Sequence, residues 1–137
     1  RTISLAYFEQ RSTVDYMGIL QGIPICFDAK ETAQRNLPVA NIHPHQVEFM
    51  REFDRQGGLT FLLVHFSADD MYYLLPFEVL NTYFDQKGEH KGAKTIPREI
   101  FEERFRIPQH TGGIPLHYLK AVLEYCKIKQ EDKRGSI

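Results

Sequence analysis

The sequence predicts an α/β protein, with a mixed central β-sheet flanked by helices. Its 137 residues are enough for one hydrophobic core but too few for two, so we expect a single domain. A segment that alternates apolar and polar side chains is followed by one with apolar residues at helical spacing, and then by a continuous apolar run. The resulting order β-β-α-β-β, with further helices, is typical of a mixed sheet covered by helices.

The first predicted strands form a hairpin. Val14 to Gln21 is predicted to be a strand, and Gly22 marks a turn. From Ile23 to Lys30 the side chains alternate with period two, which indicates a second strand with two distinct faces. Ile23, Ile25, Phe27 and Ala29 share one face, and Pro24, Cys26, Asp28 and Lys30 share the other. Ahead of this hairpin, residues 1–10 (RTISLAYFEQ) are predicted to be the end of a helix.

A helix is predicted after a polar loop over residues 31–43. Proline suits the first turn of a helix, so Pro44 indicates its start, with His43 or Asn41 as the cap. Gly57 and Gly58 indicate its end after about residue 56. Gln46, Phe49, Met50 and Phe53 fall on one helical face, which we expect to contact the sheet.

The second half of the chain is predicted to contain two further strands and three helices. The apolar run LTFLLVHF is bounded by glycines and by SADD, which is typical of a strand buried on both faces. The further predicted elements are a neighbouring strand over residues 71–77, helices over 77–84, 97–104 and 114–126, and a flexible tail over about 127–137.

Composition limits the classes of function. The formal net charge is −1, so DNA binding would require locally clustered cations. Cys26 and Cys126 alone do not make a disulfide framework. No apolar run reaches the roughly 18–20 residues that span a bilayer, and no positively charged leader opens the chain, so we expect a cytoplasmic protein without membrane contact. The chain starts at Arg1, and we expect an upstream segment to be absent.

Acidic and basic side chains on the hairpin predict a metal-dependent nuclease site. Asp28 and Lys30 share a strand face, and Asp15 on the preceding strand can lie beside them. Two carboxylates that face one point repel each other, and a divalent cation removes that repulsion. Oxygen ligands favour Mg²⁺ or Mn²⁺, and an adjacent ammonium can stabilise charge that develops on a phosphate. The alternative for Asp28 and Lys30 alone is a solvated strand face.

Two further polar residues extend the predicted site. Gln46 lies on an otherwise apolar helical face and therefore needs a polar partner, which a metal or its water can provide. Thr13 lies two residues before Asp15 and shares its strand face. Threonine is also a common strand residue, so a purely structural role for Thr13 stays open.

The sequence resembles the RecU-type Holliday junction resolvases of Gram-positive bacteria and their phages. The resemblance runs from Ala6 to about Tyr125 and depends on four segments: AYFEQRSTVDYMGILQGIPICFDAKET, NLPVANIHPHQVEFM, GGLTFLLVHFS and YYLLPF. An acidic residue followed by (D/E)-x-K on the next strand is the pattern of the PD-(D/E)xK superfamily. The resemblance therefore implies a restriction-endonuclease-like fold.

The resemblance also implies roles for individual residues. Asp15, Asp28 and Lys30 correspond to catalytic residues of the family, and Thr13, Asp15, Asp28 and Gln46 to its Mg²⁺ site, where Mn²⁺ can substitute. The family more often has glutamate at the position of Asp28. The resemblance further implies a homodimer that resolves four-way junction DNA by phosphodiester hydrolysis. It implies a role in homologous recombination and DNA repair, together with branch-migration and strand-exchange proteins. The basic N-terminal arm and part of the stalk of the family are expected to precede this chain.

Four residues are candidates for DNA contacts: Arg11, Arg35, His43 and His45. The His-x-His pair is also compatible with zinc, although capping and phosphate contact fit it better because no third ligand lies at zinc-ligand spacing. Two other functions stay open at this point. One is an endonuclease acting on duplex or flap DNA, and the other is a non-catalytic module that binds DNA or a protein partner.

Overall fold

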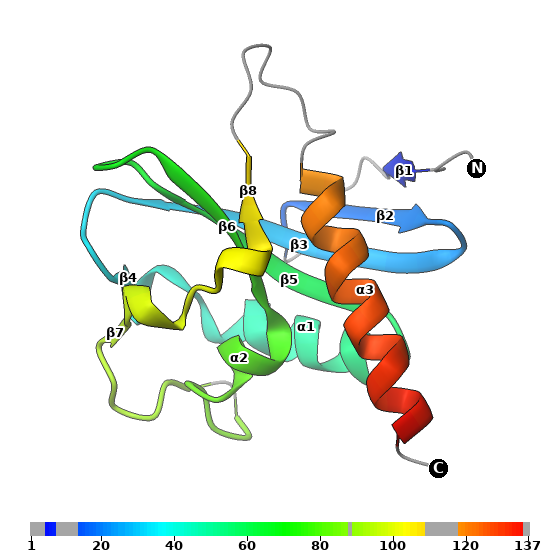
Figure 1. Cartoon of the computed structure of the whole chain (residues 1–137). Helices are drawn as coiled ribbons and strands as arrows, with labels where there is room; N and C mark the ends of the chain where they lie inside the picture. Colours follow the sequence, from blue (N-terminus) through cyan, green and yellow to red (C-terminus); the bar gives the residue numbers. More distant parts are fainter. Residues whose placement is uncertain (1–4, 8–13, 88, 109–117, 136–137) are drawn as a thin grey trace.

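A mixed six-stranded sheet organises the fold, in the strand order β1-β2-β3-β5-β6-β8 (Figure 1). The computed structural model describes residues 5–7, 14–87, 89–108 and 118–135. β3 and β5 pair in parallel, and the other neighbouring strands pair antiparallel. This arrangement confirms the predicted α/β class and is consistent with a restriction-endonuclease-like fold. The strands are β1 (Leu5–Tyr7), β2 (Tyr16–Leu20), β3 (Ile23–Thr32), β5 (Leu59–Phe66), β6 (Met71–Pro76) and β8 (Arg106–Ile107).

Helices cover both faces of the sheet (Figure 1). One core lies between the sheet, α1 (Pro44–Arg55) and α2 (Phe77–Asn81), and the other lies under α3 (Tyr118–Gly135). No helix in the described ranges is both long and apolar enough to cross a membrane. The smaller elements are β4 (Leu37–Pro38), β7 (Thr95–Ile96), which pairs with β4, and the 3₁₀ helices η1 (Val39–Asn41), η2 (Arg98–Ile100) and η3 (Glu103–Phe105).

The β2–β3 hairpin directs Asp28 and Lys30 of β3 toward α1. Gln21 and Gly22 form the tight turn with positive φ angles of 50° and 82°, as a two-residue hairpin requires. Phe27 belongs to the core under α3, and Cys26 belongs to the core under α1. Because side chains alternate along a strand, Asp28 lies on the α1 face, as its period-two pattern predicts.

α1 has the predicted bounds to within one residue. It starts at Pro44, and the side chain of Gln46 accepts a hydrogen bond from the backbone N–H of His43 at 3.2 Å. It ends before Gly57, whose φ of 94° favours glycine. Met50 is fully buried, so the predicted apolar face does contact the sheet.

Three predicted elements differ from the structure near the chain's ends. Residues 5–7, expected to end a helix, form the edge strand β1 against β2. β2 begins at Tyr16, so Asp15 lies one residue before the strand rather than within it. Residues 127–135, expected in a flexible tail, continue α3, because Lys129 reaches the carboxylates of Asp54 and Glu78 at 2.5 Å each.

Two internal predictions also differ. The helix expected over residues 97–104 is instead two 3₁₀ turns, since Phe101 between them is extended (φ −80°, ψ 114°) and packs its ring against Phe66 and Tyr73. The polar loop expected over 31–43 is shorter. β3 continues to Thr32, and β4 and η1 follow.

Candidate active site

The buried carboxylate of Asp28 is the centre of the candidate site. It is 1% exposed, although aspartate is seldom buried without partners. Oδ2 of Asp28 lies 2.8 Å from the Lys30 ammonium and accepts a hydrogen bond from Nε2 of Gln46 at 3.0 Å. Lys30 Nζ also donates to Oε1 of Gln46 at 3.1 Å. Two residues of β3 and one of α1 therefore form a closed triangle of polar contacts.

Asp15 joins this triangle through the backbone of the hairpin. The register pairs Tyr16 with Phe27, which places Asp15 opposite Asp28. The backbone N–H of Asp15 donates to Oδ1 of Asp28 at 2.7 Å, and the N–H of Ala29 donates to Oδ2 of Asp15 at 3.1 Å. The two aspartates are thus held side by side by reciprocal contacts between neighbouring chain segments.

The electrostatics of Asp15 reflect its position beside a second carboxylate. Burial raises the pKa of Asp15 above its ordinary value, and the negative charge of Asp28 raises it further. The Ala29 N–H and the Lys30 ammonium oppose this rise in the pKa without cancelling it. Positive charge near both aspartates would therefore favour the ionised pair.

The donor atoms fit a hard divalent cation. Two carboxylates and the amide oxygen of Gln46 are hard oxygen ligands, which favour Mg²⁺ or Mn²⁺ over zinc. Within the described ranges no three His, Cys, Asp or Glu side chains form a metal-binding group. A cation bound here would therefore need the Gln46 amide or water beside the two aspartates.

The structure brings together four of the predicted site residues and leaves others apart. Asp15, Asp28, Lys30 and Gln46 form the cluster, whereas Thr13 and Arg11 lie outside the described residues. His43 and His45 are exposed at the start of α1, with their rings stacked at 5.4 Å. Arg35 is an exposed residue that pairs with Glu99.

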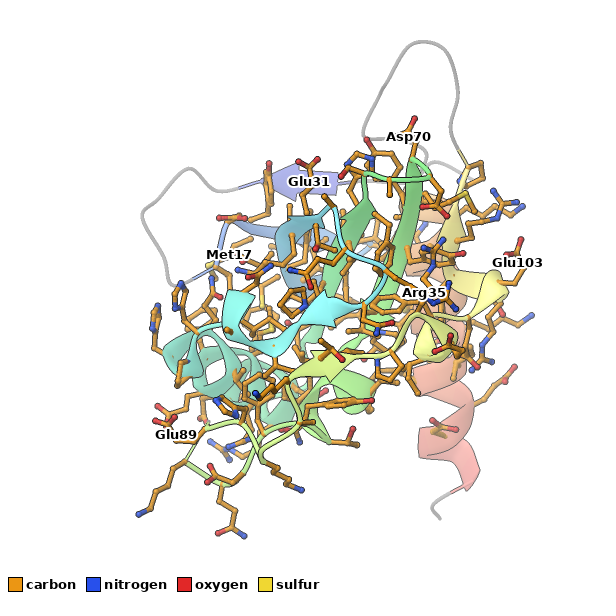
Figure 2. The ribbon with its side chains drawn as sticks, turned by 90° about the vertical axis from the view of Figure 1, so that its left-hand side faces the viewer. Met17, Glu31, Arg35, Asp70, Glu89 and Glu103 are labelled. Carbon is orange, nitrogen blue, oxygen red and sulfur yellow. The ribbon has the colours of Figure 1, made fainter. Side chains whose placement is uncertain are left out.

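Sequence reasoning missed a second charged cluster, on the other face of the sheet. His65 contacts Glu31 through Nδ1 at 2.6 Å and Asp70 through Nε2 at 2.7 Å. Its ring stacks on Tyr72 at 4.0 Å. Glu31 and Asp70 lie at the same end of the molecule in Figure 2. The alternation along β3 does place Glu31 opposite to Asp28, but no sequence signal connects it with His65 and the turn at Asp70.

Comparison with known proteins identifies the family. A family model described as Recombination protein U (RecU) matches residues 1–124. The chain belongs to the RecU family. Proteins named Holliday junction resolvase RecU are 41% identical in Lactococcus lactis subsp. lactis over 130 residues, 43% in Limosilactobacillus reuteri over 122 and 40% in Oceanobacillus iheyensis over 121.

The similarity to the RecU relatives covers most of this chain but only part of theirs. It includes 93% of this chain for the Lactococcus protein and 88% for the other two. The matched part is 59% of the Lactococcus and Limosilactobacillus proteins and 58% of the Oceanobacillus protein. The chain therefore spans about three fifths of the length of these relatives.

Proposed function

We propose that this protein is a Mg²⁺-dependent, structure-specific endonuclease that resolves Holliday junctions by phosphodiester hydrolysis. Its role would lie in homologous recombination and DNA repair. The observation that carries the proposal is the convergence of Asp15, Asp28, Lys30 and Gln46 in a chain of the RecU family. The relatives' name, Holliday junction resolvase, supports the choice of substrate.

The mechanism assigns a distinct task to each residue of the cluster. Asp15, Asp28 and Gln46, with Thr13, would hold the cation, which lowers the pKa of a bound water and neutralises charge on the phosphate. Asp28 is fixed for this task because the Asp15 N–H and the Gln46 amide hold its two oxygens. Lys30 would donate from its ammonium to a phosphate oxygen as negative charge develops there in the transition state.

Junction resolution requires two symmetric cuts, so the proposal includes a homodimer with one site in each subunit. Four-way junction DNA is the proposed substrate. Arg11, Arg35, His43 and His45 are the proposed phosphate contacts, and proteins of branch migration and strand exchange are the proposed partners. The proposed compartment is the cytoplasm.

Cleavage of a four-way junction in Mg²⁺ tests the proposal. We expect Asp15→Asn and Lys30→Ala each to slow cleavage by about 10²-fold or more, the usual scale for losing a group that stabilises charge in the transition state. Glu131→Gln and Lys127→Ala are matched controls, since both remove an exposed charge on α3, outside the cluster. If Asp15→Asn and Lys30→Ala cut as fast as the wild type, the proposed site is wrong.

Comparing the cleavage rate of the four-way junction with that of a linear duplex of the same sequence identifies the preferred substrate. Faster cleavage of the junction than of the duplex supports a resolvase. Equal rates would instead identify a duplex endonuclease that uses the same four residues.

A further inference from the structure

The position of the Lys30 ammonium indicates a role that precedes the reaction itself. We propose that Lys30 and the divalent cation compete for the same oxygen atoms of Asp28 and Gln46, so that cation binding displaces Lys30 and releases it toward the substrate. This inference rests on the proposed function, because it presupposes the cation site. It adds an exchange of cations that controls when Lys30 becomes available.

The contacts of Lys30 are those expected of a bound cation. Its Nζ lies 2.8 Å from Oδ2 of Asp28 and 3.1 Å from Oε1 of Gln46. The side chain of Lys30 is only 13% exposed and that of Asp28 only 2%, so bulk water screens this pair weakly. The ammonium therefore compensates the charge of a nearly inaccessible carboxylate.

Lys30 Nζ occupies the position between Oδ2 of Asp28 and Oε1 of Gln46, where a divalent cation held by both residues would also lie. Oδ1 of Asp28 accepts the Asp15 N–H, and Oε1 of Gln46 also accepts the His43 N–H. Nε2 of Gln46 donates to Oδ2 of Asp28, which turns Oε1 toward Lys30. Oε1 is the single side-chain oxygen of Gln46, so a cation that bridges Gln46 and Oδ2 of Asp28 would use the two oxygens that Lys30 Nζ contacts.

The Lys30 ammonium and a divalent cation cannot both contact Oδ2 of Asp28 and Oε1 of Gln46 at the same time. An ammonium and a divalent ion at the same carboxylate oxygen repel strongly where the surroundings are weakly polarisable. The lysine side chain has a flexible four-carbon stem and can leave by rotation, whereas Asp28 and Gln46 are buried. The displaced ammonium would then be free to meet the phosphate, and a site without the divalent ion would keep its lysine engaged.

Titration calorimetry with Mn²⁺ on chelator-treated protein tests the competition. We expect Lys30→Met and Lys30→Gln to bind Mn²⁺ about tenfold more tightly than the wild type, equivalent to roughly 1.4 kcal/mol. Lys127→Met is the matched control, because it removes an exposed lysine on α3, which covers the opposite face of the sheet. Its affinity should equal that of the wild type. Asp28→Asn identifies the heat that belongs to this site, because it should lose binding.

A second measurement uses the wild type and so does not depend on the folding of a variant. The ¹⁵N signal of the Lys30 ammonium should shift when Mg²⁺ saturates the site. A Lys30 signal that Mg²⁺ leaves unchanged, or Asp28-dependent affinity that is equal or weaker in both neutral variants, would overturn the competition while leaving the cation site intact. Absence of any Asp28-dependent Mn²⁺ binding would overturn both this inference and the proposed function.

Discussion

At the scale of single residues, the site places two carboxylates together at the expense of stability. Asp28 is compensated by Lys30 and by two N–H donors, but Asp15 receives the Ala29 N–H while facing the negative charge of Asp28. A side chain chosen for stability alone would not carry a charge at position 15. The arrangement is explained by a cation that the two carboxylates share.

Replacing Asp15 therefore separates stability from function. Asp15→Asn keeps an acceptor for the Ala29 N–H and removes the repulsion with Asp28. In chelator we expect it to raise the free energy of unfolding by roughly 0.5–1 kcal/mol, the scale of interactions between partly exposed charges. Urea denaturation measures the free energy of unfolding of both proteins. In saturating Mn²⁺ the wild type should gain stability, whereas Asp15→Asn should gain little. If Asp15→Asn is less stable than the wild type in chelator, repulsion between Asp15 and Asp28 does not destabilise the folded protein.

At the scale of elements, His65 connects three parts of the sheet. Glu31 lies near the end of β3, His65 lies on β5, and Asp70 belongs to the turn before β6. Only the protonated ring donates from both nitrogens, so the full connection requires imidazolium. Burial alone would lower the pKa of His65, but the carboxylates of Glu31 and Asp70 raise it above its ordinary value of 6.5.

The contribution of this connection should depend on pH. Because the pKa of His65 is higher in the folded protein, the stabilisation is fully present below about pH 6.5 and is lost as the pH rises through the folded-state value. We expect the stability difference between wild type and His65→Gln, roughly 0.2–1 kcal/mol for each exposed pair, to be largest below about pH 6.5 and to shrink as the pH rises above that value. Denaturant unfolding below and above this pH measures the difference. A difference that stays constant would show that His65 does not bridge as a cation.

The elements that the sequence predicted well are those with local signals. Period-two alternation, Gly22 in the turn and Pro44 at the helix start define the hairpin and α1, and they place Asp28 and Gln46 on facing elements. The extent of α3 had no such signal, because it depends on long-range contacts of Lys129 with Asp54 and Glu78. The contact between Lys30 and Gln46 was equally inaccessible, since it depends on the conformations of both side chains.

At the scale of the whole molecule, binding to a polyanion must overcome a net charge of −1. Two exposed arginines of the described residues are already paired with carboxylates, Arg35 with Glu99 and Arg55 with Glu52. A phosphate must therefore replace a carboxylate partner, and only arginines on the DNA-binding face will make that exchange. Arg35 follows β3, the strand of Asp28, whereas Arg55 ends α1, at the opposite end of the helix from Gln46.

The salt dependence of junction binding distinguishes these arginines. The logarithm of the association constant falls linearly with the logarithm of salt concentration, by about 0.9 for each duplex phosphate neutralised. We expect Arg35→Ala to reduce this slope by about 0.9, measured by fluorescence anisotropy in chelator to prevent cleavage. Arg55→Ala is the matched control, since both arginine side chains are 69% exposed and each pairs with a glutamate. It should leave the slope unchanged, because Arg55 lies at the opposite end of α1 from Gln46 and so away from the proposed site. A slope for Arg35→Ala equal to that of the wild type would show that Arg35 does not contact phosphate. The loop that follows β3 would then lie outside the DNA interface.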